Sequence, residues 1–314
     1  MRSYMIIGCG GIGGYYGGLL QRAGHKTCFL LRSDYAHVRR HGLQIRSKNG
    51  DFLLKRVQAY ARPESVPPCD VVVVALKATE NHRLPELLPP WIGDKPSTIV
   101  LLQNGLNQEA RIAAQAPRCR IVGGLCFVCS NKIGPGLVHH LDYGRMVLAD
   151  YRPAGCQAGL SRALRGIAAD FEKAGVPVQC VPDLAGARWH KLIWNVPFNG
   201  LSAVLRADTR QLLDMPETAA LCRTLMLETA RGARACGVPV QRAFVDKMMA
   251  DTAVMKPYAT SMLLDLKRKR PLEAEAIYGE PLREAARRGC RLPRTEFLYR
   301  QLTWLNRKTR RAEF

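Results

Sequence analysis

The sequence has no apolar run that approaches the roughly 18 residues of a membrane-spanning helix. Its longest run, Val71–Leu76, has the length of a buried strand. The first apolar stretch, Tyr4–Ile7, leads into a glycine-rich turn, where a secretory signal would have a small-residue cleavage site. We therefore expect neither a membrane segment nor a signal peptide.

A metal site is also lacking. The eleven cysteines are scattered, and the one close pair, Cys126 and Cys129, has no second Cys or His pair to complete a zinc site. Cysteines in apolar contexts act as small hydrophobic residues. We therefore expect no metal, and a reduced protein in the cytoplasm.

Acidic residues are few: 26 Asp and Glu stand against 47 Lys and Arg, which gives a net charge of +21. Residues 267–314 alone carry fourteen Lys or Arg and six Glu. Such a basic segment could bind nucleic acid. However, no aromatic residues for base stacking alternate with the basic ones, and no known nucleic-acid module is present. Small anionic ligands are therefore favoured over nucleic acid.

The first half of the chain alternates short apolar runs with helical stretches, which is typical of a parallel α/β sheet. A helix is predicted at Gly11–Ala23. The predicted strands are Tyr4–Ile7, Thr27–Leu31, Val71–Leu76, Thr98–Leu102 and Arg120–Gly123.

From Pro182 onward the β-branched runs give way to helix-compatible segments: Leu184–Leu205, Thr218–Cys236, Phe244–Met249 and Pro271–Arg288. A chain of 314 residues is long enough for two domains. We predict a Rossmann domain over residues 1–180 and an all-helical domain over 181–314. A homodimer through the second domain is compatible with this plan.

The predicted first strand ends in a G-x-G-x-x-G match that opens a helix: Gly8-Cys9-Gly10-Gly11-Ile12-Gly13. In this context the motif indicates dinucleotide binding. Gly8 allows the tight turn, Gly10 lets the backbone approach a pyrophosphate, and Gly13 lets the helix pack closely on the strand. The helix N-terminus offers N–H donors to the phosphates.

The end of the second strand favours NADP over NAD. NAD enzymes usually present an acidic residue there to the ribose hydroxyls. This sequence has Arg32, followed by Ser33 and Asp34. A guanidinium group suits a 2′-phosphate, Ser33 can add a hydroxyl donor, and the chain should have turned away by Asp34.

Two further polar residues follow predicted strands. Lys77 comes after Val71–Leu76, and Asn104 comes after Thr98–Leu102. Open α/β sheets bind ligands at the carboxyl ends of their strands. Lys77 and Asn104 are therefore cofactor-site candidates, although a surface lysine and a simple turn are the alternatives.

A third group lies in the helical half. Lys191, Asn195 and Asn199 are spaced i, i+4, i+8, so they drift by only about 40° per step and line one helix face. Buried amides must be hydrogen-bonded, so such a row is a poor core stripe. Pro197 lies inside the row and predicts a bend.

Together these motifs, with the segment from Ser261 to Glu273, resemble the ketopantoate reductase family, and the resemblance covers nearly the whole chain. It implies NADPH-dependent reduction of 2-dehydropantoate to pantoate, a step of pantothenate and coenzyme A biosynthesis. It also implies that Lys191 is the general acid, that Glu273 holds the substrate hydroxyl, and that Asn195, Asn199 and Ser261 orient a small keto acid.

Two departures from the family pattern keep other functions open. Gly200 follows Asn199 where the family often has proline, and Thr209 stands where the family has asparagine. The alternatives are a reductase of a different small 2-keto acid on the same fold, and a non-catalytic NADP-binding protein with a basic tail.

If Pro271 begins a helix, Glu273 falls in its first turn.

Overall fold

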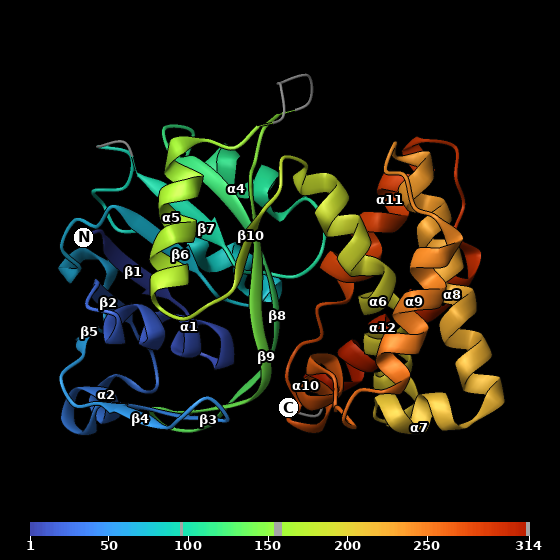
Figure 1. The fold of residues 1–314 in the computed structure, drawn as a ribbon, viewed down its shortest axis with the longest axis horizontal. Helices are drawn as coiled ribbons and strands as arrows, with labels where there is room; N and C mark the ends of the chain where they lie inside the picture. The colour runs from blue at the N-terminus through green and yellow to red at the C-terminus, as the bar shows by residue number, and fades with distance from the viewer. Residues whose placement is uncertain (95–96, 154–158, 312–314) are drawn as a thin grey trace. The chain divides into compact units, whose positions relative to one another are not determined.

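The computed structural model describes residues 1–94, 97–153 and 159–311, and the chain divides into two compact units (Figure 1). The first unit comprises residues 1–103 and 108–184, and the second comprises residues 104–107 and 185–314. The four-residue segment 104–107 therefore belongs with the second unit, although it lies within the first half of the chain. The domain border at residue 180 stays a prediction.

The first unit alternates strands and helices along the chain, as the sequence pattern predicts. Its elements are β1 (Ser3–Ile7), α1 (Gly11–Arg22), β2 (Lys26–Leu30), α2 (Tyr35–His41), β3 (Leu43–Ser47), β4 (Phe52–Leu54), β5 (Gln58–Tyr60), the 3-10 helix η1 (Pro63–Ser65), β6 (Val71–Val74), the 3-10 helix η2 (Ala78–Arg83), α3 (Leu84–Leu87), β7 (Thr98–Leu101), α4 (Gln108–Gln115), β8 (Arg120–Gly134), β9 (Leu137–Asp150), α5 (Arg162–Lys173) and β10 (Val178–Cys180).

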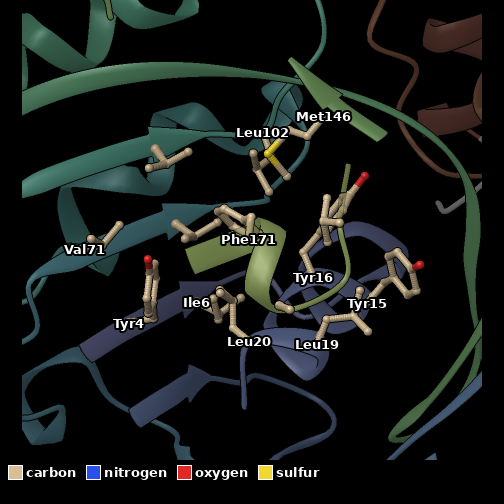
Figure 2. Packing of buried hydrophobic residues seen from close by; sticks show 14 of the residues in the cluster. Tyr4, Ile6, Tyr15, Tyr16, Leu19, Leu20, Val71, Leu102, Met146 and Phe171 are labelled. Atoms are coloured by element: carbon tan, nitrogen blue, oxygen red, sulfur yellow. The ribbon is translucent and has the colours of Figure 1, made fainter. Parts of the chain in front are cut away.

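All these strands form one sheet, in the order β4-β3-β9-β8-β7-β6-β1-β2-β5, with β10 paired to β9. The run from β8 to β5 is parallel throughout, which confirms the predicted α/β sheet. Both faces of this run are covered. On β1, Tyr4 and Ile6 pack in the cluster that includes residues of α1 and α5 (Figure 2), whereas Met5 and Ile7 pack in a second cluster with residues of α3 and α4. Burial on both faces explains the continuous apolar runs.

The strand predicted at Arg120–Gly123 is wrong in its extent. It continues to Gly134 as β8 and returns antiparallel as β9, with register shifts that indicate β-bulges. The far part of this hairpin is only partly buried and carries polar residues such as Ser130 and Lys132, so no apolar run marks it. Its partners come from distant parts of the chain, because β9 also pairs in parallel with β3.

The second unit is helical in the part that the structure describes. Its elements are α6 (Leu184–Leu205), α7 (Thr209–Asp214), α8 (Pro216–Ala235), α9 (Arg242–Ala253), α10 (Ser261–Lys267), the π-helical turn η3 (Glu275–Gly279), α11 (Glu280–Arg287) and α12 (Pro293–Arg311). Its core gathers Ile193, Val196 and Phe198 of α6 with residues of α8, η3 and α12. Among the described residues no helix is long and apolar enough to cross a membrane.

The helix predicted to start at Pro271 is wrong at its beginning. Helical structure starts at Ala274, so Glu273 precedes the helix and does not lie in its first turn. A side chain from α12 contacts the residue before Glu273. Asn306 accepts a hydrogen bond from the Leu272 N–H at 2.9 Å and donates one to the Leu272 carbonyl at 3.3 Å. In a helix from Pro271 the Leu272 carbonyl would accept an N–H from the next turn, and here it accepts the Asn306 amide instead.

Candidate active site

The glycine turn between β1 and α1 is built by close backbone contacts. Gly8 has φ +93°, a conformation that favours glycine. A Cβ on Gly13 would lie 2.1 Å from the Gly8 carbonyl oxygen, so helix and strand could not approach as they do. In contrast, a Cβ on Gly10 would meet no described atom within 4 Å. The turn is therefore open at the position where the motif brings a pyrophosphate to the backbone.

The N-terminus of α1 fits an anionic group. Gly10 caps the helix without a side-chain hydrogen bond, and the first turn contains no acidic residue. The N–H groups of the first turn and the positive end of the helix dipole are therefore not neutralised by acidic or capping side chains of this helix. These features fit the phosphates of a dinucleotide.

The β8–β9 hairpin also contacts the glycine turn, through Ser130 of β8. The Ser130 hydroxyl donates to the Gly11 carbonyl at 2.9 Å, and a Cβ on Gly11 would lie 2.3 Å from the Ser130 carbonyl oxygen. Cys9 and Ile12 pack against the cluster shown in Figure 2. Burial and the nearby Asp34 carboxylate raise the pKa of the Cys9 thiol to about 12, so this thiol stays protonated at neutral pH.

The residues after β2 differ in their exposure to solvent. Arg32 is exposed, whereas Asp34 is buried. Its carboxylate pairs with Lys132 of β8 at 2.5 Å and accepts hydrogen bonds from the Gly136 N–H at 3.1 Å and the Ser33 hydroxyl at 3.2 Å. Asp34 is therefore held by the hairpin and neutralised by a lysine, and the Ser33 hydroxyl is directed to Asp34.

The strands that carry the cofactor candidates end at the same level of the sheet. Ile7 of β1 is in register with Leu30 of β2 and with Val74 of β6. Lys77 follows β6 as the half-buried residue that precedes η2. Gly8, Arg32 and Lys77 thus extend from the carboxyl edge of three adjacent parallel strands.

In the helical unit, Lys191, Asn195 and Asn199 lie on α6 as predicted, and Pro197 is accommodated inside this helix. Asn195 and Asn199 are buried, with exposed fractions of 5% and 3%, and Lys191 is half-buried. His190, next to Lys191, hydrogen-bonds through Nδ1 to the Gly186 carbonyl at 2.7 Å and packs its ring against α9. Its side chain is therefore not part of the row.

The turn that follows Glu273 packs against the middle of this row. The Tyr278 hydroxyl, on η3, donates to the Val196 carbonyl at 2.9 Å, between Asn195 and Asn199 in the sequence of α6. A Cβ on residue 200 would lie 2.6 Å from the Tyr278 oxygen, which explains the departure at Gly200. Glu273 is buried, and its carbonyl accepts the Ile277 N–H at 3.1 Å.

The segment that begins with Ser261 also reaches α6. Thr260 caps α10, and its hydroxyl lies 2.5 Å from the hydroxyl of Ser202 on α6. Thr209 pairs with Tyr258 through both its backbone N–H and its hydroxyl, at 3.1 Å each. Thr209 is 1% exposed, so it fixes the segment before Ser261.

Two segments of the helical unit thus contact α6, the turn after Glu273 and the segment before Ser261, and sequence reasoning did not find the residues that hold them. Asn306, Tyr278 and Thr260 hold these segments, and Lys132 holds Asp34 in the other unit. No local pattern marks them, because each acts on a residue that is distant in sequence. In the part of the chain that the structure describes, no three His, Cys, Asp or Glu side chains form a metal-binding group.

Comparison with known proteins gives the family. The profile of ketopantoate reductase PanE/ApbA matches residues 4–153, and that of ketopantoate reductase PanE/ApbA C terminal matches residues 183–305. A 2-dehydropantoate 2-reductase of Nostoc sp. is 46% identical over 312 residues, which cover 99% of this chain and 98% of the relative. The chain belongs to the ketopantoate reductase family.

Solved structures of two 2-dehydropantoate 2-reductases are similar to this chain over nearly its whole length. The one from Geobacter metallireducens has a TM-score of 0.89 and 40% identity, covering 96% of this chain and 99% of that one. The one from Methylococcus capsulatus has a TM-score of 0.85 and 33% identity, covering 98% and 97%. These matches confirm the predicted Rossmann domain followed by a helical domain.

Proposed function

We propose that this chain reduces 2-dehydropantoate to pantoate with NADPH, as a step of pantothenate biosynthesis in the cytoplasm. The observation that carries the proposal is the pairing of two features in one chain of this family. One is an open glycine turn at an uncapped helix N-terminus. The other is a polar row on α6, in which the half-buried Lys191 precedes the buried amides of Asn195 and Asn199.

NADPH supplies a hydride to the ketone carbon when it is bound. The chain would hold its pyrophosphate at residues Gly8–Gly13, and Arg32 would bind the 2′-phosphate, because a planar guanidinium pairs with phosphate in a bidentate manner. Lys77 and Asn104 would contact the rest of the cofactor. These assignments rest on the strand-end positions of Arg32 and Lys77 and on the loop position of Asn104.

Lys191 would donate a proton to the ketone oxygen as negative charge develops there. Asn195, Asn199 and Ser261 would orient the substrate through hydrogen bonds. The Glu273 carboxylate would accept a hydrogen bond from the substrate hydroxyl. Asn306 holds the backbone just before Glu273 and Tyr278 holds the turn just after it, which supports a defined position for residue 273.

The experiment measures the loss of absorbance at 340 nm with purified protein, NADPH and 2-dehydropantoate. We expect turnover with NADPH, weak turnover with NADH, and a fall of about 100-fold or more in kcat for Lys191→Ala. Lys247→Ala is the matched control, since Lys247 is an exposed lysine paired with Asp251 on α9. Consumption of NADPH by Lys191→Ala at the wild-type rate would refute the assignment of the general acid.

The second candidate is a reductase of another small 2-keto acid, favoured by the use of Thr209 to hold Tyr258. Trimethylpyruvate, which lacks only the hydroxyl of 2-dehydropantoate, separates the two. A site built to bind that hydroxyl rejects the analogue strongly, because the Glu273 carboxylate is left unpaired. Equal kcat/KM for both substrates would favour the second candidate.

A homodimer also remains a prediction, and analytical sedimentation of the purified protein would test it.

A further inference from the structure

The helix after Glu273 leaves one of its carbonyl groups without an internal partner. Over the π-turn, the Glu280 N–H donates to the Glu275 carbonyl, five residues earlier. In an α-helix that N–H would bond to the Ala276 carbonyl. The next donor, five residues after Ala276, would be residue 281, which is Pro281 and has no N–H. The Ala276 carbonyl therefore needs a donor from outside its helix.

That donor comes from the 104–107 loop, the four residues that belong to the helical unit. The Leu106 N–H donates to the Ala276 carbonyl at 3.0 Å. Gly105 makes this approach possible, because its φ is +94° and a Cβ there would lie 2.4 Å from the Ala276 oxygen. The Leu106 side chain is 4% exposed and joins the core of the helical unit.

A second contact holds the end of the loop. The Asn107 side-chain amide donates to Glu280 Oε2 at 3.3 Å, and Asn107 has φ +61°, which asparagine tolerates well. The other carboxylate oxygen of Glu280 pairs with Arg283 at 3.0 Å, and Arg283 also pairs with Glu275. Glu280 is buried, with an exposed fraction of 6%, and Asn107 is half-buried, so this hydrogen bond is partly buried.

The loop connects two parts of the proposed active site. Asn104, the cofactor candidate, is two residues from Leu106, and Glu273, the substrate candidate, is three residues from Ala276. We infer that Asn107 and Glu280, together with the Ala276 carbonyl, are positioning residues that fix Asn104 relative to Glu273. This inference rests on the proposed function, in which Asn104 contacts the cofactor and Glu273 contacts the substrate.

A reciprocal exchange of the two side chains tests the inference. Asn107→Asp places a carboxylate against Glu280, and aspartate also tolerates a positive φ. In the double variant Asn107→Asp, Glu280→Gln, the glutamine amide can donate to the aspartate, so the bond returns with its direction reversed. Glu280→Gln alone keeps an acceptor for Asn107. Asn49→Asp, at an exposed position, controls for the added charge.

Kinetics and amide exchange are measured on the same proteins. We expect kcat/KM of Asn107→Asp to fall about 3- to 10-fold, the size of one hydrogen bond, and to return within about twofold in the double variant. The defect should shrink as the pH falls, because one of two facing carboxyls then binds a proton. Hydrogen exchange of the Leu106 amide should rise in the single variant and recover in the double.

The outcomes separate this inference from the proposed function. No turnover by the wild type refutes the function and the positioning role with it. With an active wild type, kinetics that stay unchanged while Leu106 exchange rises would show that the loop contacts only stabilise the fold, which overturns the positioning role. A double variant that melts as the wild type does but stays as slow as Asn107→Asp would overturn it as well.

Discussion

Replacing Lys132 by methionine should weaken NADPH binding, although Lys132 is not one of the residues proposed to contact the cofactor. In the structure, Lys132 neutralises the buried Asp34 carboxylate at 2.5 Å. Methionine keeps much of the side-chain length but leaves the carboxylate with only its two neutral donors, Gly136 and Ser33. A negative charge then stands two residues from Arg32, and two residues of chain separate Cα atoms by at most about 7 Å.

The magnitude follows from Coulomb's law. If a carboxylate and a phosphate of about −1.5 charge are taken to lie about 7 Å apart, they repel by about 1 kcal/mol in water and about 4 kcal/mol at an effective dielectric constant near 20. Arg32 is exposed, so the lower part of this range applies. We expect the Kd for NADPH to rise about 5- to 30-fold, and the Kd for NADH, which lacks that phosphate, to change little.

The assay is a titration of each dinucleotide followed by nicotinamide fluorescence, with kcat/KM for both as the second readout. Lys48→Met is the matched control, since Lys48 pairs with Asp142 on the same hairpin. The double variant Lys132→Met, Asp34→Asn removes both charges and should regain most of the NADPH affinity. An unchanged ratio of NADPH to NADH affinity in Lys132→Met would refute this reasoning.

Three other predictions concern stability and the glycine turn. Glu228→Ala should lower the free energy of unfolding by about 2–4 kcal/mol in urea denaturation. The buried Glu228 carboxylate accepts hydrogen bonds from the Thr295 N–H at 2.7 Å and from the Thr295 hydroxyl at 2.8 Å. A loss below about 1 kcal/mol would contradict this prediction. Gly13→Ala should abolish NADPH binding in the fluorescence titration, because its Cβ would lie 2.1 Å from the Gly8 oxygen. Burial raises the pKa of Asp34, but hydrogen bonds from Lys132 and Gly136 outweigh it, so the pKa lies below its usual value. The stabilisation by ionised Asp34 is therefore present above about pH 4 and is lost at lower pH, so thermal melts of wild type and Asp34→Asn should converge in acid.

The elements that the sequence predicted well are those whose burial has a simple period. Val71–Val74 is apolar throughout because both faces of β6 are covered. The helix Leu184–Leu205 has the predicted bounds, and its row of Lys191, Asn195 and Asn199 follows from helical spacing alone. Periodicity is a local property, so it can be recognised without knowledge of the partners.

The elements that were missed depend on contacts between distant residues. Helical structure starts at Ala274, just after Leu272, whose backbone is bonded to Asn306 34 residues away. The position of Asp34 is set by Lys132, 98 residues along the chain, because its carboxylate needs a buried cation. A pattern of residue types identifies Asp34 as a charge but cannot show which cation faces it. The sequence therefore predicts the site as a set of candidate residues, and only the structure shows the contacts around them.

The 104–107 loop also bears on how the protein reaches its native state. The core of the helical unit contains Leu106, a side chain supplied by the first half of the chain. A fragment that begins at Ala185 lacks this side chain and the N–H that satisfies the Ala276 carbonyl. The helical half is thus incomplete without the loop. On the ribosome the loop is made before the segment that receives it, so these contacts can form only after the π-turn has been synthesised.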